Sequence, residues 1–276
     1  MVKLLLEKQL ENGEIMGKII SLVNQKGGVG KTTSSINLAA SLGELKQKVL
    51  LIDLDPQGNT TTGIGINKAE IKKSIYDLLL DEATMSDVVI KTKFQNLYVI
   101  PATINLAGAD IELMEKDRAE EGFSKAGQLK KHLDMVRDKF DYVIIDCPPS
   151  LGLLTTNALT ASDSVIIPVQ CEFFALEGIM QLLNSIMLAQ KKLNPSLNIE
   201  GVLLTMLDSR TNLGLEVVED VKSYFKERVY DTIIPRLVRL SEAPSHGKPI
   251  IAYDPTSRGT LAYLNLAKEV IDRNGK

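Results

Sequence analysis

Eight consecutive residues near the start of the sequence have the composition of a phosphate-binding loop. They are residues 26–33, KGGVGKTT, between an apolar run at 19–23 and a helical pattern at 32–42. Glycines let the backbone close around a ligand, and the N–H groups at a helix N-terminus face a bound anion. In such loops the lysine reaches the β- and γ-phosphates and the threonine hydroxyl binds Mg²⁺. The stretch therefore predicts a phosphate site, with Lys31 on the phosphates and Thr32 on the metal.

The loop departs from the usual pattern G-x-x-x-x-G-K-[ST] at its first position. A glycine would stand five residues before Gly30, but Gln25 is there, followed by an additional lysine, Lys26. The resulting K-G-G-x-G-K-T resembles the deviant Walker A loop of the superfamily that contains ParA, MinD and the nitrogenase iron protein. The nucleotide-binding residues expected in this loop are Lys26, Gly27, Gly28, Val29, Gly30, Lys31, Thr32 and Thr33.

Three aspartates end two other apolar runs. Asp53 and Asp55 end VLLIDLD, and Asp146 ends YVIID. Residues two apart on a strand point the same way, so one of the first two carboxylates could position an attacking water and the other could hold the Mg²⁺ shell. An acid after a buried strand beside a phosphate loop is typical of a Walker B position, which binds Mg²⁺ directly or through water. A turn-capping role is the alternative for all three.

Arginines follow two of the late apolar runs. Arg210 lies in LDSRTN, and Arg236 and Arg239 lie in IPRLVRL. A solvated surface is the default interpretation for arginines. The alternative is that the two clusters together form a phosphate-binding strip.

Apolar runs alternate with helical patterns from residue 18 onward. Continuous apolar strands suit a parallel sheet covered on both faces, and the alternation predicts a doubly wound α/β fold. Ligands in such sheets bind at the carboxyl ends of the strands, where all these motifs lie. The predicted strands are 19–24, 49–53, 97–100, 142–146, 165–168, 201–206 and 232–234. The predicted helices are 32–42, 75–80, 125–140, 152–161, 176–192, 215–225 and 260–273.

Length and composition limit the possible functions. The 276 residues allow one large α/β domain, and a net charge of −3 means that any contact with nucleic acid must be a local patch. The two cysteines, without a CxxC pair, suit a reducing cytosol and indicate neither a zinc nor a redox site. No apolar run approaches the roughly 18 residues of a membrane span.

Four regions are weaker in pattern. Residues 1–15 are interpreted as an N-terminal extension to a single domain at 16–276, although a lipid- or partner-binding helix is the alternative. Residues 58–73 contain three threonines and no long apolar run, and are predicted to be a mobile loop. Residues 115–131 are charge-rich and are predicted to be a solvated helix and loop. His132 is predicted to be solvated on a charged helix.

Longer motifs extend the resemblance to most of the chain. From about residue 16 onward the sequence is similar to the chromosomal ParA-type ATPases of the Soj group. The segments that carry the likeness are NQKGGVGKTT, LLIDLDPQGN, DCPPSLGLLTTNALTASDSVIIPVQCEFFALEG, EGVLLTMLDSRTNLG and RLSEAPSHGKPI.

This resemblance implies a P-loop ATPase that uses ATP, ADP and Mg²⁺. Lys26 corresponds to the signature lysine that reaches the nucleotide of the other subunit in an ATP sandwich dimer. Asp55 corresponds to the aspartate needed for hydrolysis. The implied catalytic residues are Lys26, Lys31 and Asp55; the implied metal residues are Thr32, Asp53 and Asp146; Met206 and Pro235 are implied at the adenine; Arg210 and Arg239 are implied at the DNA.

The implied partners are a second copy of the chain, non-specific double-stranded DNA and a ParB-type (Spo0J) protein, on the nucleoid in the cytoplasm. The alternative is a MinD-like, membrane-associated cell-division ATPase. That class ends in a basic amphipathic helix, whereas the helix predicted here at 260–273 is expected to pack on the sheet, so no stable membrane association is expected. The sequence also departs from the family at Leu237, where IPRN is usual.

Overall fold

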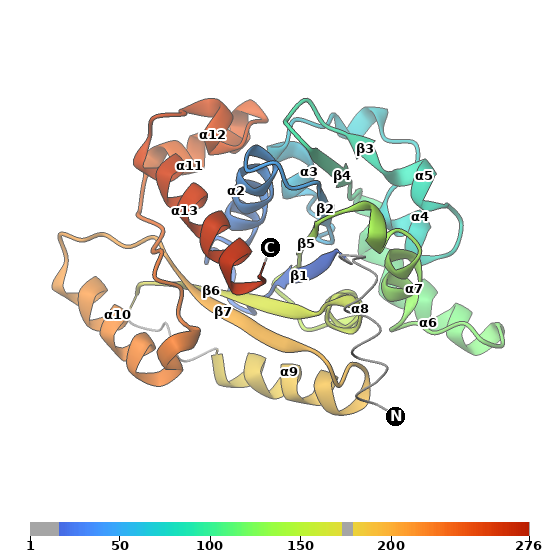
Figure 1. Ribbon diagram of the computed structural model, residues 1–276. Helices are drawn as coiled ribbons and strands as arrows, with labels where there is room; N and C mark the ends of the chain where they lie inside the picture. Colours follow the sequence, from blue (N-terminus) through green and yellow to red (C-terminus); the bar gives the residue numbers. More distant parts are fainter. Residues whose placement is uncertain (1–16, 173–178, 276) are drawn as a thin grey trace.

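A single seven-stranded sheet organises the chain (Figure 1). The structure is a computed structural model that describes residues 17–172 and 179–275. The strand order is β3-β4-β2-β5-β1-β6-β7, and every pairing is parallel except β3 with β4. The strands are β1 Lys18–Leu22, β2 Val49–Asp53, β3 Ile90–Lys91, β4 Leu97–Ile100, β5 Tyr142–Asp146, β6 Ser164–Gln170 and β7 Asn198–Thr205.

The register of the central strands places the predicted motifs at one edge. Asp146 at the end of β5 pairs with Leu22 of β1 on one side and with Asp53 of β2 on the other. All five residues of β2 and of β5 are buried, as expected for strands covered on both faces. The phosphate loop and the aspartates therefore lie together at the carboxyl end of the sheet.

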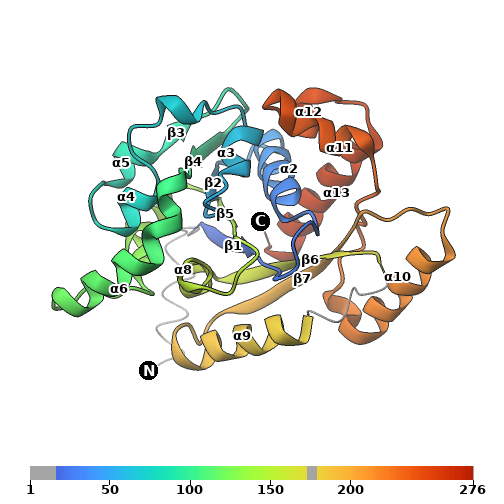
Figure 2. The ribbon, with the colours of Figure 1, turned by 180° about the vertical axis from the view of Figure 1, so that it is seen from behind.

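Two helical layers cover the sheet (Figures 1 and 2). Neighbouring residues on β1 face opposite layers, because Ile19 belongs to one apolar cluster and Ile20 to the other. The layer of Ile20 contains α2 Lys31–Glu44, α3 Asn59–Gly63, α11 Val238–Glu242, α12 Ile250–Tyr253 and α13 Arg258–Arg273. The layer of Ile19 contains α4 Ile75–Leu79, α5 Met85–Val88, α6 Ala109–Ala119, α7 Gln128–Asp134, α8 Leu153–Ala161, α9 Ile179–Lys192 and α10 Asn212–Phe225.

The mostly parallel, doubly wound fold predicted from the sequence is confirmed, as are six of its strands and its main helices. Short 3₁₀ segments complete the connections: Lys68–Glu70, Ile104–Gly108, Arg137–Lys139, Lys226–Arg228 and Ala243–His246. The C-terminal helix α13 packs on α2 and buries Tyr263, Leu266 and Val270 in their shared cluster. Among the described helices, none has the length and apolar character needed to cross a bilayer.

Several predicted elements differ from the structure. Residues 232–234 form no strand. The N–H of Ile234 donates to the carbonyl of Leu204 in β7 at 2.9 Å, and isolated bridges flank the segment, from Val229 to Val202 and from Pro235 to Leu207. The helix predicted at 125–140 is shorter, because it is α7 followed by a separate 3₁₀ turn. Within 115–131, residues 115–119 belong to α6, and the two-residue strand β3 was not predicted. Residues 1–15, and 176–178 of the predicted α9, lie outside the described residues.

Two predictions of solvated structure are wrong. The stretch 58–73 is not a plain loop, because it begins with α3, in which Thr60 and Thr61 are fully buried. His132 is only 5% exposed, and its Nε2 atom lies 2.9 Å from Oδ1 of Asp81. Both errors arise from polar residues that are buried against carboxylates, a pairing that hydrophobic periodicity does not reveal.

Candidate nucleotide-binding site

The phosphate loop adopts the conformation that its glycines allow. Gly28 has φ = 76° and Gly30 has φ = 86°, in the left-handed region that residues with a Cβ atom rarely adopt. Gly30 is the N-cap of α2, and its carbonyl accepts the N–H of Ser34 at 2.8 Å. The loop therefore delivers the chain directly into the N-terminus of a 14-residue helix, where backbone N–H groups favour an anion.

The two lysines of the loop have different surroundings. Lys31, the first residue of α2, is 7% exposed, and its Nζ atom donates to the carbonyl of Lys26 at 3.2 Å. Burial lowers the pKa of Lys31, and the nearby carboxylate of Asp146 opposes this effect. The side chain of Lys26 is exposed at the loop's entrance, while its backbone N–H is held by Asn24 Oδ1 at 3.0 Å.

Asp146 is the centre of a hydroxyl network. Its Oδ2 accepts hydrogen bonds from Thr32 Oγ1 at 2.8 Å and from Thr60 Oγ1 at 2.7 Å. Its Oδ1 accepts from Ser35 Oγ at 3.0 Å. The carboxyl group is completely buried, and burial raises its pKa against the lowering effect of these hydroxyl donors.

These residues fit a magnesium site. Because Thr32 donates its proton to Asp146, the lone pairs of its oxygen remain available to a cation. Mg²⁺ is usually bound by one or two protein oxygens together with waters and phosphates, rather than by a dedicated cage. The described residues contain no cluster of three or more His, Cys, Asp or Glu side chains placed to hold a metal.

Asp53 and Asp55 occupy different environments despite their spacing. Asp53 is fully buried, and its Oδ2 accepts both the N–H of Thr61 at 2.8 Å and its hydroxyl at 2.6 Å. Burial raises the pKa of Asp53 to about 7, with the neighbouring Asp146 adding to the effect. Asp55 is half-buried and lines the cavity of the phosphate loop. Of the pair, Asp55 is thus the one exposed to a ligand, and a metal role for Asp53 stays a prediction.

Two adjoining cavities lie over the loop. The first, of about 420 Å³, is bordered by the loop, Asp55, Gln57 and Pro149. The second, of about 140 Å³, is bordered by Pro235 and Leu237. Gly30, Thr33 and Met206 line both, so the structure brings Met206 and Pro235 to a pocket that continues the phosphate site. The loop residues that line the first cavity are Gly27, Gly28, Gly30, Lys31, Thr32 and Thr33.

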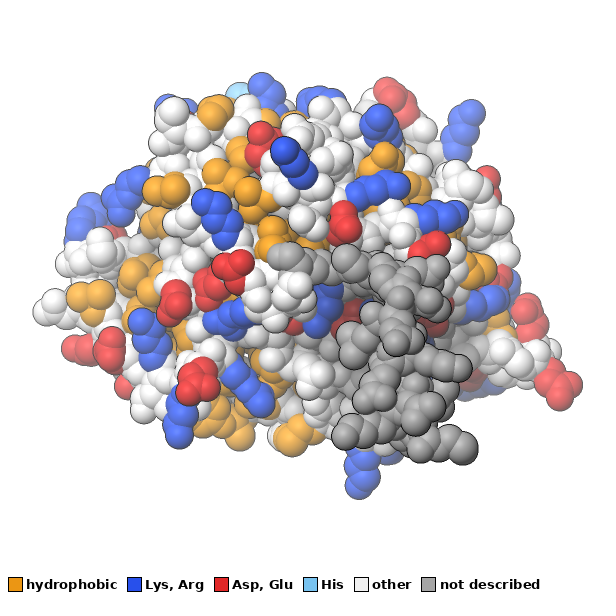
Figure 3. All heavy atoms as spheres, viewed as in Figure 1, with side chains coloured by type: hydrophobic (Ala, Val, Ile, Leu, Met, Phe, Trp, Pro, Cys, Tyr) orange, Lys and Arg blue, Asp and Glu red, His pale blue; other side chains and the backbone are white. Residues whose placement is uncertain are grey.

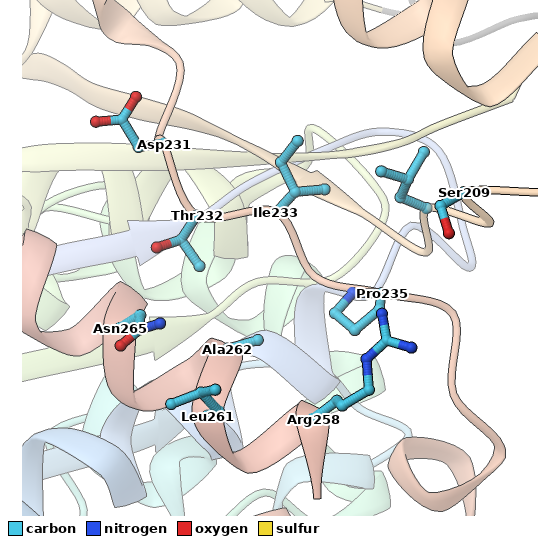
Figure 4. A pocket seen from close by; sticks show the side chains of 10 residues that line it. Ser209, Asp231, Thr232, Ile233, Pro235, Arg258, Leu261, Ala262 and Asn265 are labelled. Carbon is cyan, nitrogen blue, oxygen red and sulfur yellow. The ribbon is translucent and has the colours of Figure 1, made fainter.

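A third cavity, of about 450 Å³, lies on the other side of Pro235 (Figure 4). Figure 4 shows Asp231, Thr232 and Ile233 on one wall and side chains of α13, among them Arg258, on the other. It does not include any residue of the phosphate loop. Size alone therefore does not identify the site; the loop and its carboxylates do.

The predicted DNA arginines are exposed but paired. Arg210, in the loop before α10, makes two hydrogen bonds to the carboxylate of Asp208, at 2.8 and 2.6 Å. Arg239, on α11, lies 3.3 Å from Glu242 and 3.7 Å from Asp254. Lys and Arg side chains are visible at the rim of the molecule near these two elements (Figure 3). An approaching phosphate would have to compete with these acidic neighbours.

Three hydroxyl residues of the site were not predicted. Ser35 lies one helical turn after Lys31, so the helix periodicity could have placed it beside Asp146. Thr60 and Thr61 gave no such signal, because the short helix that carries them has no apolar period.

Comparison with known proteins gives a consistent result. Residues 17–199 match a family described as an AAA domain. The chain is 62% identical to the sporulation initiation inhibitor protein Soj of Bacillus subtilis, over 92% of this chain and 98% of that protein. It is 51% identical to the chromosome partitioning protein ParA of Myxococcus xanthus, over 94% of this chain and 89% of that protein.

Solved structures agree with these relatives. Cobyrinic acid a,c-diamide synthase from Mycobacterium smegmatis, with bound ADP and magnesium, has a TM-score of 0.80 and 36% identity, covering 95% of this chain and 97% of that one. The septum site-determining protein MinD from Pyrococcus horikoshii, complexed with Mg-ADP, has a TM-score of 0.78 and 27% identity, covering 94% and 98%.

Proposed function

Because the chain belongs to the Soj/ParA family of partitioning ATPases, we propose that it is a dimerising switch that ATP turns on and hydrolysis turns off. It is an ATPase that uses Mg²⁺, in line with the relatives and with the ADP and magnesium bound in the solved structures. The ATP dimer binds DNA without sequence preference and acts in chromosome or plasmid partitioning, on the nucleoid, together with a ParB-type protein.

The observation that carries this proposal is the contrast between Lys26 and Lys31. Lys31 is buried in its own loop, positioned for the phosphates of the nucleotide that this subunit binds. The ammonium group of Lys26 is exposed and forms no ion pair or hydrogen bond with the residues that the structure describes. A lysine free at the mouth of a phosphate site is available to a nucleotide held by a facing subunit, as a sandwich dimer requires.

Within one subunit, the chain's own groups account for slow hydrolysis. Lys31 and the N-terminus of α2 bind and neutralise the phosphates. Thr32 and Asp146 would hold the Mg²⁺, which would supply positive charge beside the phosphates. Asp55, on the cavity wall, orients the attacking water. Met206 and Pro235 provide apolar contacts for the adenine.

Dimerisation also explains how an acidic chain can bind DNA. A dimer carries two copies each of the exposed Arg210 and Arg239, twice as many as a monomer. Because affinity for DNA depends steeply on the number of phosphates contacted, doubling the contacts turns a weak monomer into a binder. ATP-dependent dimerisation would therefore control DNA binding without any change in the arginines themselves.

Light scattering with ATP, and separately with ADP, tests this proposal on three proteins: wild type, Lys26→Ala and Lys31→Ala. We expect wild type to double in mass with ATP only. Lys26→Ala should still bind fluorescent ATP but remain a monomer, whereas Lys31→Ala should lose nucleotide binding itself. A Lys26→Ala protein that dimerises like wild type would show that the exposed lysine does not act across an interface.

A further inference from the structure

The short helix α3 is fastened to two strand-end carboxylates by consecutive threonines. Thr60 donates its hydroxyl to Oδ2 of Asp146 at 2.7 Å. Thr61 donates both its N–H and its hydroxyl to Oδ2 of Asp53, at 2.8 and 2.6 Å. Both threonines are completely buried. Because a buried polar group that loses its hydrogen-bond partner is costly, these contacts hold α3 on the ends of β2 and β5.

Each threonine also connects α3 to another part of the site. The oxygen of Asp146 that accepts from Thr60 also accepts from Thr32, the residue expected to bind Mg²⁺. The hydroxyl oxygen of Thr61 accepts the backbone N–H of Ala102, just beyond β4, at 2.9 Å. The pair therefore joins the helix of the phosphate loop, the end of β2, the end of β5 and the segment after β4.

The turn that carries Asp55 leads directly into this helix. The N–H of Gly58 donates to the carbonyl of Asp55 at 2.8 Å, and the N–H of Gln57 donates to Asp55 Oδ1 at 2.9 Å. Gly58, the N-cap of α3, has φ = 61°, so the chain reverses sharply there. Only the five residues 54–58 lie between Asp53 at the end of β2 and Asn59 at the start of α3. The position of the Asp55 carboxylate thus depends on the two elements that the turn connects, β2 before it and α3 after it.

We propose that Thr60 and Thr61 are positioning residues for hydrolysis: their hydroxyls clamp α3 to Asp146 and Asp53 and thereby hold Asp55 against the phosphate cavity. The part of this inference that concerns hydrolysis rests on the ATPase function proposed above. The part that concerns the clamp does not, because it involves only hydrogen bonds between residues of this chain. Thr60 and Thr32 donate to the same carboxyl oxygen of Asp146. This shared oxygen couples the turn of Asp55 to the end of the phosphate loop that is expected to bind the metal.

The neighbouring Thr62 offers a matched control. It lies on the same helix, but it is exposed, and its hydroxyl only returns to the carbonyl of Gly58 at 3.0 Å. Thr60→Val removes the hydroxyl at nearly constant shape, Thr60→Ser retains it, and Thr62→Val makes the same chemical change outside the clamp. Differences among these three variants therefore report the bond to Asp146 rather than the threonine content of α3.

Two measurements test the proposal. The first is amide hydrogen exchange over residues 54–64 of the nucleotide-free protein. The second is steady-state ATP hydrolysis, with kcat and KM determined separately. Removing one buried hydrogen bond should increase exchange roughly tenfold in Thr60→Val and lower kcat by a similar factor, with little change in KM. Thr60→Ser should restore both properties, and Thr62→Val should match wild type.

Three outcomes would overturn the clamp: wild-type exchange and kcat in Thr60→Val, equal losses in Thr62→Val, or failure of Thr60→Ser to restore either property. If Thr60→Val does not fold, Thr61→Val takes its place with the same expectations, since it leaves Asp146 untouched. If wild type itself does not hydrolyse ATP, the proposed function fails, while the exchange measurement still decides whether the clamp exists.

Discussion

The ammonium group of Lys31 lies 3.2 Å from the backbone carbonyl of Lys26, so one lysine of the phosphate loop is held by the backbone of the other. Lys31 is also buried, and burial lowers its pKa. A bound phosphate would supply the negative charge that this buried cation needs. The loop is thus arranged to bind an anion.

The first prediction concerns that buried cation. Lys31→Ala removes the charge that faces the phosphates, and truncating one partner of a buried charge pair costs roughly a hundredfold or more in affinity. We expect this loss in the binding of fluorescent ADP, measured by titration. Lys72→Ala is the control, because Lys72 is exposed and far from the loop in sequence. Equal affinities of Lys31→Ala and wild type would remove the loop from the nucleotide site.

The second prediction concerns the DNA surface. Arg210→Ala should weaken DNA binding by the ATP dimer while leaving its dimerisation intact. Each phosphate contact contributes about 0.9 to the slope of log affinity against log salt, so losing one arginine per subunit should reduce that slope by roughly two. Filter binding or fluorescence anisotropy across a salt series measures both quantities.

Two further variants make this test specific. Arg118→Ala removes an exposed arginine on α6, away from α10 and α11, and should bind DNA like wild type (Figure 1). Asp208→Asn removes the carboxylate that now pairs with Arg210, and should therefore tighten binding. If Arg210→Ala retains the wild-type affinity and slope, the DNA surface has been placed on the wrong elements.

The third prediction is a pH dependence of folding. Burial lowers the pKa of His132 from 6.5, although Asp81 opposes the shift and Lys131 adds to it. The unfolded chain therefore takes up a proton on this imidazole at a higher pH than the folded chain does. The contribution of this residue to stability is complete above about pH 6.5, the unfolded-state value, and is lost as the pH falls from there through the lower pKa of the folded state.

Urea unfolding at a series of pH values checks this sign with wild type and His132→Gln. We expect the free energy of unfolding of wild type to fall relative to that of His132→Gln as the pH is lowered from 8 to about 5. The comparison of two proteins matters because Asp53, whose pKa is raised to about 7, contributes with the opposite sign in both. A difference that stays constant with pH would show that His132 does not titrate across folding.

Much of the fold was predictable because its strands are continuous apolar runs. VLLID and YVIID gave β2 and β5 with their bounds, and their terminal aspartates marked the edge where the site lies. The phosphate loop was equally predictable, since glycine at positive φ has few substitutes. The strand predicted at 232–234 was wrong for a related reason: the segment has apolar residues, but it runs beside β7 with a single backbone hydrogen bond, from the N–H of Ile234 to the carbonyl of Leu204, and forms no ladder.

The polar part of the site was less predictable. Thr60 and Thr61 are buried by hydrogen bonds to Asp146 and Asp53, not by apolar packing, and His132 is buried beside Asp81 in the same way. Such burial depends on partners far away in the sequence, so neither composition nor periodicity reports it. The ion pair between Arg210 and Asp208 is local, yet sequence cannot tell a paired arginine from a free one.

The most direct test of the switch is DNA binding by Asp55→Ala, with ATP and with ADP, across a salt series. Without the carboxylate that we propose to orient the water, ATP should persist and hold the protein as a dimer on DNA of any sequence. We predict binding with ATP only, weakening as salt rises. Binding that is absent in both nucleotide states, or equal in both, would contradict an ATP-controlled DNA switch.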